Sequence, residues 1–104
     1  MINKKQYAFI LLPCLVFNSG SAFSSSDDAW DEFRRDVELK CLEASRAGTP
    51  SMNIKEIQVD PFGSDNFGFA LVKFEDRNEP GTRFIACTYD KETNSAETSS
   101  PFHP

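Results

Sequence analysis

The chain has 104 residues with 11 basic and 16 acidic side chains, and its formal net charge is −5. This length allows a single small domain. Because an acidic chain repels nucleic acid and anionic membrane surfaces, we expect neither as a partner.

The first 22 residues have the three-part order of a secretory signal peptide. Lys4 and Lys5 precede the apolar run Tyr7–Phe17, and small residues follow up to Ala22. The apolar run is too short to cross a bilayer as a helix, which needs about 20 residues. We therefore predict a signal peptide over residues 1–22 with cleavage after Ala22, and a periplasmic or secreted protein.

A lipoprotein signal is the alternative, with Cys14 as the lipidated residue, because this cysteine follows an apolar stretch. Pro13 stands where a small, flexible residue should precede the cleaved bond, and the apolar run continues past Cys14. We therefore favour cleavage and release, without a stable membrane anchor.

Cleavage leaves 82 residues, which carry nine basic and 16 acidic side chains and a net charge of −7. Cys41 and Cys87 are then the only cysteines, and such a pair in a small exported domain usually forms a disulfide. The bond would close a loop of about 47 residues and contribute about 4 kcal/mol to stability. Two cysteines and the distant His103 make no zinc site.

An amphipathic helix is expected over residues 28–47. Apolar side chains recur there at intervals of three and four residues, which is the period of one helix face. Gly48 and Pro50 then supply a cap and a stop. The buried stripe of this helix consists of Trp30, Phe33, Val37, Cys41 and Ala44.

Three strands are expected after the helix. The first breaks its alternation once, and a β-bulge near Lys55 and Glu56 would accommodate the break. The turn signal Asn78–Gly81 joins the last two strands into an antiparallel hairpin. The strands are Met52–Asp60, Phe67–Glu75 and Arg83–Asp90.

These elements predict an α+β domain over residues 23–90, with one N-terminal helix packed on a three-stranded antiparallel sheet and a single disulfide. Cys41 on the buried helix stripe would meet Cys87 on the helix-facing side of the third strand. Residues 91–104 contain almost no apolar side chain before Phe102, so we expect a flexible C-terminal tail.

The sequence favours no catalytic mechanism. His103 is the only histidine, and it lies near the end of the expected tail, where it lacks the fixed geometry that catalysis needs. No nucleophile elbow, P-loop or HExxH pattern is present. We therefore expect no enzymatic activity and no cofactor, and a small hydrolase built on paired carboxylates is the least favoured alternative.

The loop Asp60–Asn66 is the segment with the richest chemistry. Asp60, Asp65 and Asn66 offer oxygen atoms of the kind that calcium prefers, but the spacing of an EF-hand is missing. We expect no metal there. A tight turn is the plainest interpretation, and a recognition loop with Phe62 or Phe67 exposed is the alternative.

Phenylalanine is abundant, and the central strand carries it on both faces, with Phe67 and Phe69 opposite Phe74. One helix can cover only one face of the sheet, so the other face is expected to be partly exposed, as in interaction surfaces and dimers. The residues expected to form the binding surface are Phe62, Phe67, Phe69, Phe74, Asp60 and Asp65.

Several segments resemble small exported proteins of alphaproteobacteria. They are Lys40–Leu42 on the helix, Val59–Ser64, Phe69–Val72 and Ile85–Lys91. The resemblance covers most of the mature chain. It implies an envelope location and the cysteine pair, and it implies no activity and no catalytic residue.

We therefore expect a small, non-enzymatic periplasmic or exported protein with a binding or accessory role. It would act through the aromatic sheet face and the loop at residues 60–66. Its partner would be a protein of the cell envelope or a second copy of the chain. The alternative is an inhibitor of a cationic, lysozyme-type hydrolase, which the net charge of −7 and the compact fold favour.

Overall fold

The structure, a computed structural model, describes residues 25–104. The expected signal peptide, the cleavage site after Ala22 and Cys14 lie outside the described residues. One helix is followed by four strands. In chain order the elements are α3 (Ser25–Gly48), β1 (Met52–Val59), β2 (Phe67–Asp76), β3 (Glu79–Asp90) and β4 (Ser95–Thr98).

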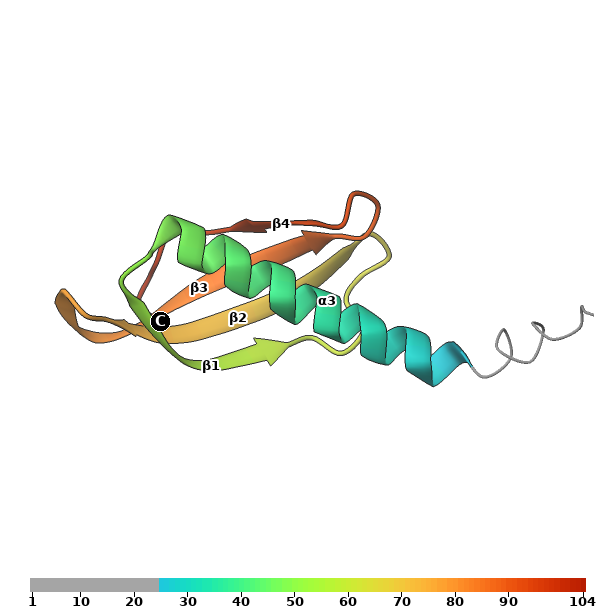
Figure 1. Cartoon of the computed structure of the whole chain (residues 1–104), viewed down its shortest axis with the longest axis horizontal. Helices are drawn as coiled ribbons and strands as arrows, with labels where there is room; N and C mark the ends of the chain where they lie inside the picture. Colours follow the sequence, from blue (N-terminus) through green and yellow to red (C-terminus); the bar gives the residue numbers. More distant parts are fainter. Residues whose placement is uncertain (1–24) are drawn as a thin grey trace, which may run out of the picture.

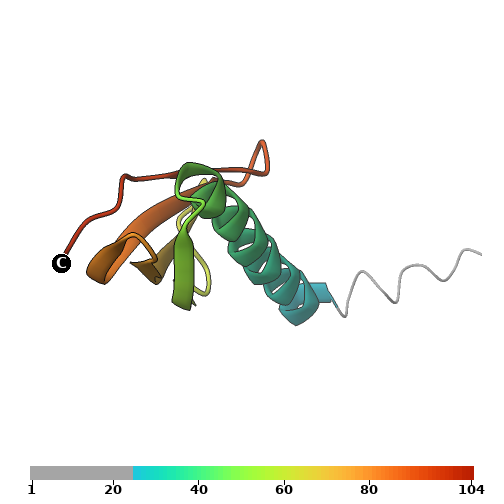
Figure 2. The ribbon, with the colours of Figure 1, turned by 60° about the vertical axis from the view of Figure 1, so that its left-hand side comes forward.

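Helix α3 packs on one face of an antiparallel sheet with the strand order β1-β2-β3-β4 (Figure 1). This confirms the α+β class and the helix-on-sheet arrangement. The helix crosses the strands diagonally, and its first turns extend beyond the sheet (Figure 1). Turned by 60°, the helix is seen to lie on one side of the sheet only (Figure 2). Within residues 25–104, no helix is long and apolar enough to cross a membrane.

The helix buries most of the face that its apolar spacing predicted, with Trp30 as the exception. Val37 and Cys41 are fully buried, and Phe33 and Ala44 are half-buried. Ser45 is also buried, and its hydroxyl has no hydrogen-bond partner in the described chain. Acidic residues in the first turn and Arg46 in the last turn complement the helix dipole.

The predicted disulfide between Cys41 and Cys87 is present and joins the middle of α3 to β3, with the two Cα atoms 5.9 Å apart. Both cysteines are buried in one half of the core. The other half lies around the fully buried Phe74. The buried core residues are Val37, Cys41, Ala70, Cys87 and Tyr89 in the first half, and Met52, Val72, Phe74 and Ile85 in the second.

The sheet has four strands, so the prediction of three was wrong. The fourth, β4, comes from the segment expected to be a flexible tail, and it pairs with β3 from Cys87↔Thr98 to Asp90↔Ser95. Further along, Phe102 exchanges two backbone hydrogen bonds with Phe84, of 2.8 and 2.9 Å. The folded unit therefore extends beyond Asp90 to the last residues of the chain.

The turn before β4 explains how this polar segment folds. The Asp90 carboxylate accepts hydrogen bonds from the backbone N–H groups of Glu92 and Thr93, at 2.8 and 3.3 Å. Asn94 then takes a left-handed conformation with φ 59°, which asparagine tolerates better than most residues. The chain reverses there and aligns β4 with β3.

Of the other expectations, the β1 bulge and the β2–β3 hairpin are confirmed, but the hairpin turn predicted at Asn78–Gly81 is displaced. The predicted bulge in β1 is confirmed, because the register between β1 and β2 shifts between Ile54 and Glu56. The hairpin turn of β2 and β3 is centred on Arg77 and Asn78, so β3 begins at Glu79, four residues earlier than expected.

Gly68 on β2 allows the helix to come close to the sheet. A Cβ atom at this position would lie 2.7 Å from Cγ2 of Val37 and 2.9 Å from Cζ of Phe33. Both distances are shorter than ordinary van der Waals contacts. The absence of a side chain at Gly68 therefore sets how closely α3 packs at this point.

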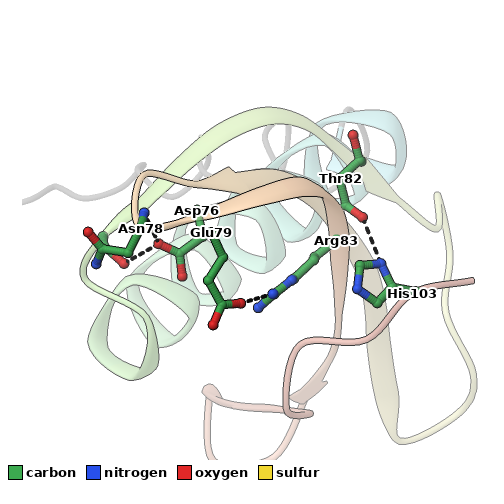
Figure 3. Close-up of polar contacts among 7 residues, drawn as sticks. Asp76, Asn78, Glu79, Thr82, Arg83 and His103 are labelled. Carbon is green, nitrogen blue, oxygen red and sulfur yellow. Dashed lines mark hydrogen bonds and ion pairs between the residues drawn. The ribbon is translucent and has the colours of Figure 1, made fainter.

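Asp76 lies at the end of β2, beside the turn that leads into β3 (Figure 3). Its carboxylate accepts hydrogen bonds from the backbone N–H of Asn78 at 2.9 Å and from Ser51 Oγ at 2.7 Å. The Asn78 N–H is the main cause that lowers the pKa of Asp76 below its ordinary value, and the Ser51 hydroxyl is the second. The ionised side chain thus joins the turn after β2 to the residue before β1.

We expect Gly68→Ala to lower the free energy of unfolding by about 1–3 kcal/mol, because the added methyl group overpacks the contact with Val37 and Phe33. Urea denaturation measures the effect. Gly48→Ala is the matched control, since nothing lies within 4 Å of a Cβ there, and it should be neutral or slightly stabilising. Equal stability of Gly68→Ala and the wild type would contradict the close approach.

We expect Asp76→Asn to destabilise the fold near neutral pH and to lose that effect in acid. A carboxyl whose folded pKa is lowered contributes stability above its unfolded pKa of about 3.9, and this contribution disappears as the pH falls through the lower folded value. Denaturation curves at several pH values should therefore converge for wild type and variant at low pH. The control is Asp65→Asn, at an exposed loop position. If the stability difference between wild type and Asp76→Asn were the same at every pH, the stabilising role of the Asp76 carboxylate would be refuted.

Candidate functional site

Two of the predicted surface residues, Phe67 and Phe69, lie on the sheet face that points away from α3. They are 40% and 37% exposed, respectively. Phe74 lies on the opposite, helix-facing side and is fully buried. Its place in the predicted binding surface is therefore corrected: Phe74 belongs to the core.

The side of the sheet that points away from α3, the outer face, carries apolar side chains on two neighbouring strands, β2 and β3. Register places Leu71 opposite Ala86 on the neighbouring strand. The rings of Phe84 and Phe102 have their centroids 6.3 Å apart, so the C-terminal segment adds an aromatic residue to this face. The apolar residues of the outer face are Phe67, Phe69, Leu71, Phe84, Ala86 and Phe102.

The loop Asp60–Asn66 forms a tight turn, held largely by its own hydrogen bonds. The Asp60 carboxylate accepts from the backbone N–H of Phe62 at 3.3 Å. Ser64 donates its N–H to the carbonyl of Phe67 at 2.8 Å, and its hydroxyl accepts from the Phe67 N–H at 3.1 Å. Gly63 permits the reversal with φ 72°.

The two carboxylates of this loop have different roles. Asp60 is engaged by the turn itself, whereas Asp65 is exposed at its tip. Within residues 25–104, no group of three or more His, Cys, Asp or Glu side chains is arranged to hold a metal ion.

Phe62 lies apart from the outer face, against the projecting end of the helix. Its ring meets Trp30 edge to face at a centroid distance of 4.9 Å, and Trp30 meets Phe33 in the same way at 5.6 Å. Phe33 in turn contacts Tyr89 at 6.1 Å. The structure therefore divides the predicted aromatic surface into an outer-face part and this second cluster.

Lys91 fastens the loop to the aromatic cluster. Its ammonium nitrogen lies 4.8 Å from the ring centroid of Phe33 and 5.5 Å from that of Trp30. The same nitrogen donates to the carbonyl oxygens of Ser64 at 2.6 Å and Phe62 at 3.3 Å. Lys91, which lies in the turn between β3 and β4, thus contacts both the helix and the loop.

Arg34 supports the loop from its other side. It donates to the carbonyl oxygen of Pro61 at 2.9 Å and to the Asp31 carboxylate at 2.7 Å. Its guanidinium carbon lies 5.7 Å from the ring centroid of Phe62. Cation–π contacts of this kind contribute about 0.5–1 kcal/mol at exposed sites.

A hollow of about 390 Å³ opens beside this cluster, between the N-terminal half of α3 and the turn that precedes β4. The hollow is shallow and broadly open to solvent. Its lining combines aromatic rings with charged groups of both signs. The lining residues are Ala29, Trp30, Glu32, Phe33, Asp36, Tyr89, Lys91 and Asn94.

Sequence reasoning missed the roles of Trp30 and Lys91. The apolar spacing predicts Trp30 in the buried stripe, yet the side chain is 36% exposed. Lys91 belongs to the segment that was expected to be a flexible tail. No sequence signal joins these two residues, since their contact depends on the turn that starts β4.

The arrangement is a small disulfide-bonded α+β module with two separate aromatic surfaces. No family model, curated protein or solved structure matches the chain. The candidate site is therefore interpreted from its own geometry.

We expect Lys91→Met to loosen the loop at residues 60–66 while the fold persists. The methionine retains an apolar stem but removes the ammonium that donates to Phe62 and Ser64. Loss of about 1 kcal/mol should raise the hydrogen-exchange rates of the Ser64 and Phe67 amides about fivefold. Lys55→Met removes an ammonium whose ion pair with Glu75 spans 3.9 Å and should leave both amides unchanged. Unaltered exchange in Lys91→Met would contradict the role assigned to Lys91.

Proposed function

We propose that this chain is an exported, non-enzymatic binding protein of the cell envelope that docks on another protein through its outer face. The observation that carries the proposal is the exposure of Phe67 and Phe69 on a sheet face that α3 does not cover. Contiguous exposed aromatic and aliphatic side chains on a small domain are a common feature of protein interaction surfaces.

The outer face has the anatomy of a docking surface. Phe69 and Leu71 occupy alternate positions of β2, which is paired with a strand on either side. Polar residues border them, with Gln58 opposite Leu71 on β1 and Thr88 opposite Phe69 on β3. An apolar centre with a polar rim is the usual composition of a protein interface.

Export is supported by two separate features of the chain. The N-terminal sequence has the order of a signal peptide. The bond between Cys41 and Cys87 is of the kind that persists in oxidising compartments such as the periplasm. A binding role outside the cytoplasm agrees with both.

The proposal of a non-enzymatic role is supported by the position of the only histidine. The His103 ring donates through Nδ1 to the carbonyl oxygen of Thr82 at 3.2 Å, near the start of β3 (Figure 3). The aromatic hollow is lined by residues at the other end of β3. The histidine and the hollow therefore do not form one site.

We expect the double variant Phe67→Thr/Phe69→Thr to lose partner binding while it folds normally. Threonine keeps the strand preference but removes both aromatic contacts, which should weaken binding about thirtyfold if these residues are the central contacts. The measurement is quantitative cross-linking and mass spectrometry of the tagged protein in its own host envelope, with sedimentation of the purified protein to detect self-association.

Phe62→Ala is the matched control, because Phe62 is 55% exposed but lies away from the outer face. A protein captured by wild type and control but lost in the double variant would support the proposal, as would self-association lost in the same way. The outcome that overturns it is an identical set of captured proteins for all three forms, with all of them monomeric.

A further inference from the structure

The hollow beside α3 combines the two features that recognise a cation. Its apolar lining comes from Trp30 and Phe33, with the buried Tyr89 beneath them, and Lys91 lines it on the side of the loop. Glu32 and Asp36 line it from the helix, four residues apart and so on neighbouring turns of one helix face. Rings carry negative charge on their faces, and carboxylates add full negative charge beside them.

These two carboxylates have no partner of their own. Neither Glu32 nor Asp36 takes part in any ion pair among the side chains that the structure describes. Asp31, which pairs with Arg34, lies on the other flank of the helix beside the loop at residues 60–66. The flank that faces the hollow therefore keeps its negative charge.

The chain itself demonstrates that a cation suits these rings. The Lys91 ammonium lies over Phe33 and Trp30, and its hydrogen bonds go to the loop carbonyl oxygens of Phe62 and Ser64. Lys91 thus lies on the side of the aromatic cluster that faces the loop at residues 60–66. The carboxylates belong to the helix wall of the hollow, where no basic side chain is paired with them.

Beyond the hollow, the helix carries charged side chains of both signs. A second hollow of about 320 Å³ shares Asn94 with the first and is lined by Glu43 and Lys40 of α3 and by Ser95 and Ala96 of β4. The two hollows share Asn94 and so lie next to each other along α3. A partner segment lying across both would pass Asp36, Lys40 and Glu43.

We propose that the hollow binds an arginine side chain of a partner protein. A guanidinium is planar, stacks on aromatic rings and pairs with carboxylates through several N–H groups, so it matches a wall of rings bordered by Glu32 and Asp36. The net charge of −7 expected for the mature chain attracts a basic partner from a distance. This site lies on the helix side of the sheet and is independent of the outer face.

Trp30 provides a direct test, because it is the only tryptophan of the chain and it lines the hollow. Residues 23–104 with the disulfide intact are titrated with an acetylated, amidated tetra-arginine peptide while Trp30 fluorescence is recorded. The matched probe is tetra-citrulline, whose urea groups have the shape of guanidinium without its charge. We expect a saturable signal for the arginine peptide and at least about tenfold weaker binding of the citrulline peptide.

Variants separate the site from general charge attraction. Glu32→Gln/Asp36→Asn should weaken binding of the arginine peptide about tenfold. Glu38→Gln/Glu97→Gln also removes two negative charges, but from exposed positions that do not line the hollow. This double variant should weaken binding less than twofold. Thermal denaturation checks that both double variants are folded.

Three outcomes would overturn the proposal. They are equal binding of the arginine and citrulline peptides, equal weakening by the two double variants, and saturation of Trp30 fluorescence by tetra-glutamate instead of tetra-arginine. None of these results depends on the outer face, so they leave the proposed docking surface to its own test.

Discussion

The crossing of α3 over β3 is the constraint on which the other features depend. Cys41 and Cys87 join the two elements covalently at the centre of the core. The two cysteines are 46 residues apart in the sequence, so their disulfide lowers the conformational entropy of the unfolded chain considerably. A small domain with few core residues depends on this contribution to its stability. Gly68, beside Val37 and Phe33, then permits the close packing that the bond imposes.

This crossing also determines where the two aromatic surfaces lie. One helix covers one face of the sheet, so the outer face has no cover among the described elements. The first turns of the helix project beyond the sheet. Trp30 belongs to the N-terminal part of the helix and is 36% exposed. The loop at residues 60–66 and Lys91 close around that projecting end. Both surfaces are thus consequences of how one helix is placed.

The sequence predicted the helix, the disulfide and the β1 bulge because each depends on local spacing or on a unique pair of residues. It missed β4 because backbone hydrogen bonds to β3 hold this short edge strand, and Ala96 is its only apolar contact with the core. The turn residues Asp90 and Asn94 were the available signal. The contact of Lys91 with Trp30 was beyond prediction, since it follows from that turn.

The burial of Phe74 could have been predicted from the sequence. Cys87 faces the helix and pairs with Ala70, so Ala70 and Phe74, four residues further on, share the disulfide side. The expected hairpin turn was displaced, yet a shift of the pairing by two residues leaves every side chain on the same face. The disulfide and the hairpin pairing together therefore assign Phe74 to the core and Phe69 to the outer face. A pair of cysteines can in this way determine which face of a sheet is free to meet a partner.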